Sequence, residues 1–194
     1  TPYAPHLATG SDDKLVKLWS FNQSQNSQKS TSLKGHNARV NQVGFCKIRD
    51  YLGSVSHDKT FRIWDLPSKK NILIQEGHLH EISCLSFQCD SALAATGDLS
   101  GIGMIWDLRI GKRIFSLEGH VKQIFGLSFN ESNGYTILSG GDDNTMRMWD
   151  LRKRGEVAII PAHNKPVSSV FLSDEFSLSA GFDGVIRLWN SRDW

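Results

Sequence analysis

The chain has 194 residues and a formal net charge of +2, with 39% hydrophobic and 22% charged residues. This composition is that of an ordinary globular domain rather than a disordered segment, and the small net charge argues against a domain whose main task is binding phosphates. No run of about 18 apolar residues occurs, so we expect no membrane-spanning helix. The cysteines, Cys46, Cys84 and Cys89, lack a CxxC spacing and are interpreted as buried thiols.

Residues 1–20 contain two short strand-like segments, His6 to Thr9 and Lys14 to Trp19. A polar segment follows from Phe21 to Ser32, rich in Ser, Gln and Asn, and it has no core-forming residue after Phe21. This composition is typical of an exposed connection, so we expect a loop there.

From Gly35 onward the chain repeats one pattern about every 42 residues: Gly-His or Ala-His, an alternating apolar segment, a Gly/Asp-rich turn and a Trp. The short β-branched and aromatic runs predict strands, and no segment has the 3.6-residue period of a helix. The predicted strands are 40–45, 51–56 and 61–64, then 82–87, 92–96 and 103–106, then 124–129, 135–139 and 145–149, and 167–172, 176–180 and 185–189. Outer strands are predicted at 71–75, 113–117 and 156–160.

The tryptophans Trp19, Trp64, Trp106, Trp149 and Trp189 follow one another at intervals of 45, 42, 43 and 40 residues. This period, with its Gly-His and Trp-Asp signatures, resembles the WD40 repeat. The resemblance implies an all-β WD40 β-propeller with one blade per repeat, at approximately residues 1–20 (partial), 35–65, 77–107, 119–150 and 162–190. Four complete repeats and about half of a fifth make residues 1–194 a partial propeller. We expect two to three further repeats outside them to close a seven-bladed ring, with a tight four- or five-bladed closure as the alternative.

The same resemblance implies one structural tetrad of His, Ser or Thr, Asp and Trp in each blade. The third repeat has Ser100 where the Asp is expected, with Asp98 two positions earlier, so we expect this blade to be the softest. In the first repeat only Thr9, Asp13 and Trp19 are present. The other members are His36, Ser54, Asp58 and Trp64; His78, Thr96 and Trp106; His120, Ser139, Asp143 and Trp149; and His163, Ser179, Asp183 and Trp189.

Three catalytic or ligand-binding interpretations of these residues are disfavoured. A Ser-His-Asp hydrolase would need one nucleophile in a cleft, whereas here the set recurs in every blade. His78-Leu79-His80 is a close histidine pair without the Cys/His cluster of a zinc site. The glycines of Ser100 to Gly103 match neither GxGxxG nor a P-loop. We therefore predict no catalytic residue, metal, cofactor or small-molecule substrate.

Loop residues near each tetrad are the candidate partner-binding face, since the resemblance implies contacts three and five positions after the His and one before the Asp. Phe125, Phe182 and Leu99 are the most informative, because an apolar group on an exposed loop can anchor an interface. The alternative is that they pack against neighbouring blades. The other candidates are Arg39, Asn41, His57, Glu81, Ser83, Gln123, Asp142, Pro166, Ser168 and, in the partial blade, Asp12.

Several longer strings resemble the WD-repeat subunits of the spliceosomal U4/U6 small nuclear ribonucleoprotein. They include LEGHVKQIFG from Leu117, WDLRKR from Trp149 and IPAH from Ile160. The resemblance implies a non-enzymatic nuclear scaffold in pre-mRNA splicing that binds protein subunits of the U4/U6 particle and the tri-snRNP. An adaptor that reads a peptide in another pathway, such as substrate recruitment or chromatin binding, is the alternative.

The most basic cluster is Arg152, Lys153 and Arg154, after a Trp-Asp. It is a candidate contact to the phosphates of small nuclear RNA, which would not require a base-reading motif. The alternative is a solvated turn, since no RNA-binding motif is present in the chain.

Overall fold

The computed structural model describes residues 7–22 and 27–190, which form eighteen strands in five antiparallel sheets. Residues 1–6, 23–26 and 191–194, which include the expected strand start at His6, lie outside the described part. Across the described ranges no helix occurs, and so none that could cross a membrane. The all-β expectation is confirmed.

Each sheet is a meander of consecutive strands. The first sheet has β1 (Leu7–Gly10), β2 (Val16–Asn22) and β3 (Ser27–Leu33). The second has β4 (Val40–Phe45), β5 (Tyr51–Ser56), β6 (Phe61–Asp65) and β7 (Lys70–Gln75). The third has β8 (Ile82–Phe87), β9 (Leu93–Asp98), β10 (Ile102–Asp107) and β11 (Lys112–Glu118). The fourth has β12 (Ile124–Phe129), β13 (Thr136–Gly141), β14 (Thr145–Asp150) and β15 (Gly155–Pro161), and the fifth has β16 (Val167–Leu172), β17 (Phe176–Gly181) and β18 (Ile186–Asn190).

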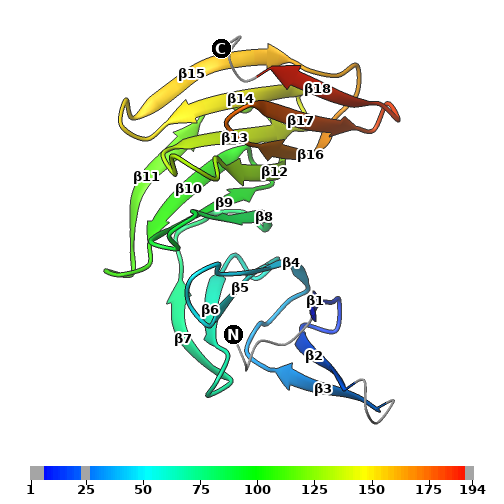
Figure 1. Cartoon of the computed structure of the whole chain (residues 1–194), viewed down its shortest axis with the longest axis vertical. Coiled ribbons are helices and arrows are strands. Elements are labelled where there is room, and N and C mark those ends of the chain that lie inside the picture. The colour runs from blue at the N-terminus through cyan, green and yellow to red at the C-terminus, as the bar shows by residue number, and fades with distance from the viewer. Residues whose placement is uncertain (1–6, 23–26, 191–194) are drawn as a thin grey trace.

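The five sheets follow one another around an open arc, with the first and fifth sheets at its two ends (Figure 1). Contacts between consecutive sheets run mainly through their innermost strands, β4 to β8, β8 to β12 and β12 to β16. The described residues are thus blades arranged side by side and not a ring closed on itself, so the tight four- or five-bladed closure is wrong for this part of the chain.

The hydrophobic core is divided into one layer between each pair of neighbouring sheets. Trp64 packs with Val16 and Leu18 of the first sheet, and Trp149 packs with Ile105 of the third. Trp64, Trp106 and Trp149 are at most 2% exposed. A β-bulge precedes each of them in the pairing with the outer strand, and bulges of this kind increase strand twist.

Side chains on the inner strands also join neighbouring blades by accepting backbone hydrogen bonds. Ser86 Oγ accepts from the Phe129 N–H at 3.2 Å, and Ser128 Oγ accepts from the Leu172 N–H at 3.0 Å. Between the second and third sheets, Gln42 Oε1 accepts from the Leu85 N–H at 2.7 Å.

The expected loop between Phe21 and Ser32 is wrong where the structure describes it, since Phe21 and Asn22 end β2 and Ser27–Leu33 forms β3. This strand pairs with β2 from Val16 opposite Leu33 to Asn22 opposite Ser27. An outer strand is held by backbone hydrogen bonds to one neighbour, which a polar sequence can make as well as an apolar one.

Candidate functional site

The tetrad of the second sheet is a continuous chain of hydrogen bonds from the core to the loop above it. The Trp64 indole N–H donates to Ser54 Oγ at 2.8 Å, and Ser54 Oγ lies 2.7 Å from His36 Nε2. His36 Nδ1 lies 2.8 Å from Asp58 Oδ2. With Nδ1 donating to the carboxylate, Nε2 is left to accept from the Ser54 hydroxyl, so every group in the chain has a partner.

The same geometry recurs in the third, fourth and fifth sheets. The indole N–H of Trp106, Trp149 and Trp189 donates to the hydroxyl ten residues earlier at 2.8, 2.8 and 2.9 Å. The hydroxyl in turn lies 2.7 to 2.8 Å from Nε2 of His78, His120 and His163. In the described part of the first sheet, the Trp19 indole N–H donates to Thr9 Oγ1 at 3.0 Å.

The hydroxyls of these networks are placed for structure and not for attack on a substrate. Ser54, Thr96 and Ser139 are fully buried and Ser179 is 1% exposed. Each hydroxyl bonds both an indole and an imidazole and is enclosed by the core, so no open approach to it is left for a scissile carbonyl.

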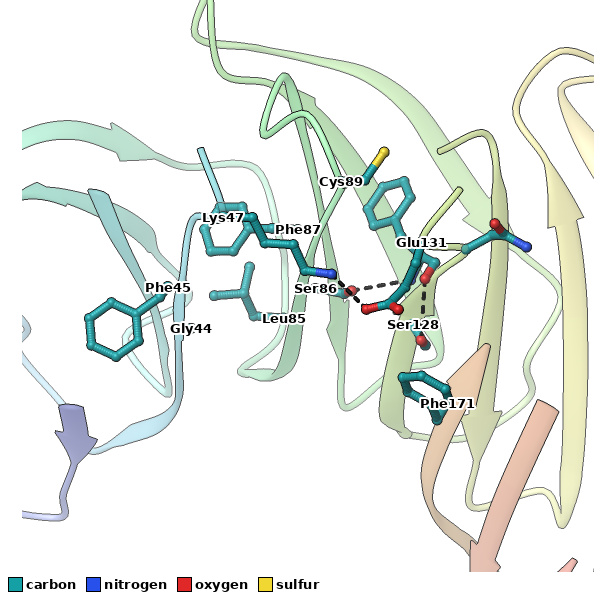
Figure 2. A pocket seen from close by; sticks show the side chains of 12 residues that line it. Gly44, Phe45, Lys47, Leu85, Ser86, Phe87, Cys89, Ser128, Glu131 and Phe171 are labelled. Atoms are coloured by element: carbon teal, nitrogen blue, oxygen red, sulfur yellow. Dashed lines mark hydrogen bonds and ion pairs between the residues drawn. The ribbon is translucent and has the colours of Figure 1, made fainter. Parts of the chain in front are cut away.

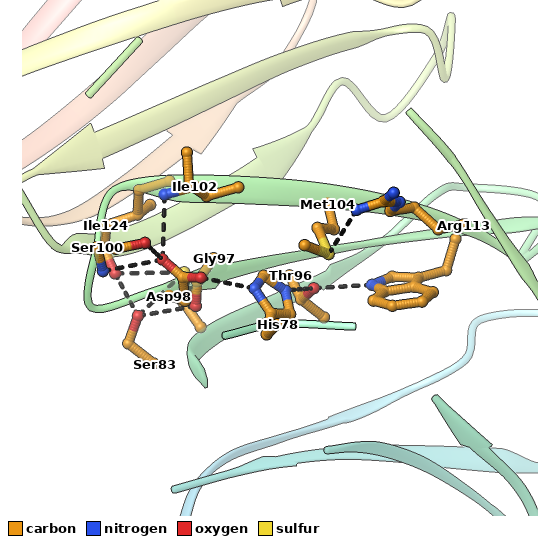
Figure 3. Close-up of polar contacts among 12 residues, drawn as sticks. His78, Ser83, Thr96, Gly97, Asp98, Ser100, Ile102, Met104, Arg113 and Ile124 are labelled. Atoms are coloured by element: carbon orange, nitrogen blue, oxygen red, sulfur yellow. Dashed lines mark hydrogen bonds and ion pairs between the residues drawn. The ribbon is translucent and has the colours of Figure 1, made fainter. Parts of the chain in front are cut away.

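In the third sheet the carboxylate comes from Asp98, which is 1% exposed (Figure 3). Its Oδ2 lies 2.8 Å from His78 Nδ1, and its Oδ1 accepts from the Ser100 hydroxyl at 2.6 Å and the Ile102 N–H at 3.1 Å. The expectation that this blade lacks its carboxylate acceptor is therefore wrong, because the acceptor reaches the same histidine nitrogen from a position two residues earlier.

In the fourth and fifth sheets a glycine stands at the position of Asp98. These glycines show why a carboxylate at that position can reach the histidine. A Cβ on Gly141 would lie 2.7 Å from His120 Nδ1, and a Cβ on Gly181 would lie 2.5 Å from His163 Nδ1. A side chain at this position therefore points directly at the imidazole. When the Asp comes two residues later, this position holds glycine in the fourth and fifth sheets and the small Ser56 in the second, whose hydroxyl donates to the Ala38 carbonyl. In the third sheet it holds the Asp itself, Asp98.

The environment keeps the tetrad Asp residues ionised and the imidazole of His120 neutral. Burial on its own would raise the pKa of Asp58, but hydrogen bonds from His36, the Asn37 N–H and Thr60 hold that pKa below its usual value. Asp98 and Asp143 have lowered pKa values through the same balance of burial against hydrogen bonds. Burial lowers the pKa of His120, against the opposing effect of Asp143.

The candidate partner-binding residues lie on the loops beside the tetrads, and some of them contact one another. Arg39 Nε lies 3.0 Å from Asn41 Oδ1 and 3.0 Å from His57 Nε2, so these three form one polar cluster on the second sheet. Asn41 also donates to the Ile82 carbonyl of the third sheet. Asp142 lies 3.7 Å from the ammonium of Lys122.

Phe125 and Phe182, predicted as anchors from two different repeats, are in contact with each other. Their ring centroids are 5.6 Å apart in an edge-to-face arrangement, with Phe125 on β12 and Phe182 just after β17. Phe182 remains 58% exposed while Phe125 is half-buried. The two predicted readings, packing between blades and an exposed apolar anchor, are therefore combined in one aromatic pair.

Other predicted face residues are partly occupied by contacts within the blades. Ser83 Oγ donates to the Gly97 carbonyl, and Ser168 Oγ donates to the Ala180 carbonyl. Leu99 is half-buried, and its N–H donates to the Glu81 carbonyl. Backbone bonds also link Gln123 to Asp142 and Pro166 to Phe182. Among the candidate face residues, the exposed ones are thus Asp12, Arg39 and Phe182.

In the basic cluster, Arg152 is held in place and is not a free cation. Its guanidinium bonds Asp150 through Nη2 to Oδ2 at 2.9 Å and through Nε to Oδ1 at 3.2 Å. It also stacks 3.9 Å from the centre of the Tyr135 ring. Lys153 and Arg154 are exposed beside it. Arg109 makes the same bidentate pair with Asp107, and these hydrogen bonds lower the pKa of Asp107 to about 2.

A recess of about 240 Å³ lies at the ends of the inner strands and was not foreseen in the sequence (Figure 2). Phe45 and Phe171 line it, each 38% exposed, together with Cys89. The ion pair of Lys47 with Glu131 spans it at 2.6 Å. Within the described residues no group of three His, Cys, Asp or Glu side chains is arranged to hold a metal ion, and His78 is committed to its tetrad.

Comparison with known proteins connects this geometry to a family. The profile described as "WD domain, G-beta repeat" matches residues 1–20, 27–65, 69–107, 111–150 and 154–190. The chain is 30% identical to "Nuclear distribution protein PAC1" of Arthroderma otae over 97% of the chain and 34% of that protein. It is 28% identical to "Pre-mRNA-processing factor 19" of Bos taurus over 84% of the chain and 32% of that protein. The same-named protein of Oryza sativa subsp. japonica is 31% identical over 96% of the chain and 28% of that protein. The chain thus spans about a third of the length of these relatives.

Proposed function

This chain belongs to the WD40 (WD domain, G-beta repeat) family, and from that premise we propose that it is a non-enzymatic scaffold in pre-mRNA splicing. In this role it helps to assemble the U4/U6 small nuclear ribonucleoprotein and the tri-snRNP in the nucleus through protein–protein contacts. Propellers of this family act in general as platforms for such contacts, since they present loops on a rigid frame.

The observation that carries the scaffold role is the Phe125–Phe182 pair. Two aromatic rings from neighbouring blades meet at 5.6 Å, and one of them is 58% exposed on the loop face. Aromatic side chains are enriched among the residues that contribute most to protein interfaces. Because each ring is carried by a different hydrogen-bonded sheet, the pair is positioned before a partner arrives, which reduces the entropy lost on binding.

Two observations support splicing as the process. The strings from Leu117, Trp149 and Ile160 resemble WD-repeat subunits of the U4/U6 particle. Relatives named as pre-mRNA-processing factors match most of the chain. Contact with RNA, if made, uses the exposed Lys153 and Arg154 on phosphates, since Arg152 is paired with Asp150.

A WD40 adaptor that reads a peptide in another pathway is the second candidate. It is favoured by the relatives named nuclear distribution proteins, which match 97% of the chain at 30% identity. The Phe125–Phe182 pair would then receive an apolar side chain of that peptide.

Affinity purification from nuclear extract with RNA identification separates the two candidates. The scaffold proposal expects U4 and U6 RNA together with their proteins on the wild-type chain, and loss of both on the Phe125→Ala/Phe182→Ala variant. Val121→Ala is the matched control, because Val121 is apolar and 76% exposed in the same repeat but outside the pair. Proteins recovered without U4 or U6 RNA would reject splicing assembly and favour the adaptor.

A further inference from the structure

One position on the third strand of each repeat carries a cation in every repeat but one. Two residues before the tetrad Trp stand Lys17, Arg62, Arg147 and Arg187, whereas the third repeat has Met104. The repeats therefore serve as internal controls for what this position does.

In the second and fourth sheets the arginine fills a niche over the glycine that precedes the tetrad His. A Cβ on Gly35 would lie 2.8 Å from Arg62 Nη1, and a Cβ on Gly119 would lie 2.7 Å from Arg147 Nη1. The Arg147 guanidinium pairs with Glu156 and lies 3.9 Å from the tetrad carboxylate of Asp143. The Arg62 residue is 9% exposed and the Arg147 side chain 12%, so the niche encloses a guanidinium almost completely.

In the third sheet the same place holds no guanidinium from the third strand. The nearest atoms to a Cβ on Gly77 belong to Trp106, at 3.3 Å, and to Met104, whose sulfur is 3.9 Å away. A hollow of about 380 Å³ opens there. Its lining includes the apolar side chains of Met104, Ile102 and Leu79, of which Leu79 is 79% exposed.

The charges around the hollow are two carboxylates and one guanidinium. Asp98 occupies the place that Asp143 has in the fourth sheet, and Glu118 is exposed at the hollow. The guanidinium is that of Arg113 on β11, with Nη1 4.0 Å from the sulfur of Met104 (Figure 3). The carboxylates therefore outnumber the cation in the place where two other blades hold an arginine.

We propose that this hollow binds an arginine side chain of a partner protein. The planar guanidinium enters over Gly77, as those of Arg62 and Arg147 do over their own glycines, and pairs with Glu118. Its methylene stem packs on Met104, Ile102 and Leu79. The site is separate from the Phe125–Phe182 pair, so it does not depend on the partner or pathway proposed above.

Methionine-methyl NMR of the whole 194-residue chain tests the proposal. The chain has three methionines, all buried: Met104, which is 5% exposed and lines the hollow, and Met146 and Met148 in the layer between the fourth and fifth sheets. The probe is acetyl-Ala-Arg-Ala-amide, with the citrulline peptide as its neutral isostere and the lysine and glutamate peptides as charge controls. A saturable shift of the Met104 methyl with the arginine peptide is expected, with at least fivefold weaker binding of the citrulline peptide. The methyl signals of Met146 and Met148 should not move.

Two variants distinguish a site for arginine side chains from a site for acidic side chains. Glu118→Gln should weaken the arginine peptide several-fold, and Arg113→Ala should retain or strengthen its binding, because a repelling charge is removed. Unchanged Met146 and Met148 signals verify the fold of both variants. The proposal is overturned by the absence of a saturable Met104 shift. It is equally overturned if the glutamate peptide binds and Arg113→Ala abolishes that binding, which would make the hollow a site for acidic side chains.

Discussion

The ammonium of Lys47 lies 2.6 Å from Glu131 Oε1, 84 residues further along the chain, so that one ion pair joins the second and fourth sheets past the third. The two side chains are 53% and 51% exposed. Exposed pairs contribute about 0 to 1 kcal/mol because water and salt screen them.

We therefore expect Lys47→Ala to lower the free energy of unfolding by less than about 1 kcal/mol, and by less still in concentrated salt. Urea denaturation at low and high sodium chloride concentrations measures this difference. A large, salt-independent loss would mean that the pair maintains the arrangement of the blades.

The tetrads should be among the most sensitive polar positions of the fold. Trp149→Ala removes a side chain that is 2% exposed, and we expect it to cost about 3 to 5 kcal/mol. Asp143→Ala leaves the Nδ1–H of the buried His120 without its acceptor and should cost about 1 to 3 kcal/mol. Chemical denaturation measures both losses.

Lys122→Ala is the surface control in the same repeat, since its side chain is 60% exposed. Its effect should stay within about 0.5 kcal/mol. If all three variants unfolded at the same denaturant concentration, the structural role of the tetrad would be refuted.

The carboxylate that accepts from His78 should work equally well when it is moved from position 98 to position 100. Asp98→Gly removes the acceptor of His78 Nδ1 and should destabilise the chain by about 1 to 3 kcal/mol. Adding Ser100→Asp to this variant recreates the arrangement of Gly141 and Asp143, so most of the loss should be recovered. Ser100→Asp alone places two carboxylates at one imidazole and should destabilise the chain.

Thermal unfolding of the four proteins, with a double-mutant cycle, provides the measurement. A double variant no more stable than Asp98→Gly alone would show that the two positions are not equivalent routes to the same histidine nitrogen.

Stability should fall on acidification in two steps. The folded pKa of His120 is lowered, so the stability linked to it is fully present above the unfolded pKa of about 6.5 and is lost as the pH falls toward the folded value. The lowered pKa values of Asp58, Asp98 and Asp143 contribute stability that is present above about pH 4 and is lost below it. Urea midpoints between pH 8 and pH 3 should show a plateau, a shallow decline from about pH 6.5 and a steeper one below about pH 4. A rise in stability between pH 7 and pH 5 would contradict this assignment.

The three cysteines should differ in reactivity. Burial raises the pKa of Cys46 and of Cys84 to about 12, whereas Cys89 is half-buried and lines the recess. Because alkylation requires an accessible thiolate, iodoacetamide at pH 8 should modify Cys89 first in the native chain. Peptide mass spectrometry locates the label, and the urea-unfolded chain, in which all three react, is the control. Equal labelling in the native chain would contradict the burial of Cys46 and Cys84.

The repeated elements could be predicted because their spacing follows from sheet geometry. Ser54 and Trp64 are ten residues apart, and in the antiparallel pair of β5 and β6 the tryptophan lies opposite Leu52, two residues before the serine. An indole can reach a hydroxyl across that diagonal, so the same spacing in every repeat indicates the same bond.

Contacts that depend on side-chain reach or on the packing of distant blades could not be predicted in this way. Nothing local in the sequence pairs Phe125 with Phe182, since they meet only when two blades are adjacent. The strand Ser27–Leu33 has no apolar alternation because its hydrogen bonds to β2 come from the backbone. Asp98 supplies the tetrad carboxylate from a position two residues earlier than the Asp of the other repeats, and a pattern with fixed spacing misses it.

The hydrogen bonds that Ser86 and Ser128 accept from the next blade affect how the sequence of such a chain can change in evolution. Each of these hydrogen bonds needs one hydroxyl as acceptor on one blade but only a peptide N–H as donor on the next, which every residue except proline supplies. The blade that donates the N–H can therefore change its side chain at that point, to any residue but proline, without loss of the bond. The acceptor can also move, as Gln42 shows by reaching the Leu85 N–H from a different position. The sequences of duplicated blades joined in this way can diverge separately. Each blade can acquire its own surface while the hydrogen bonds between neighbouring blades are kept.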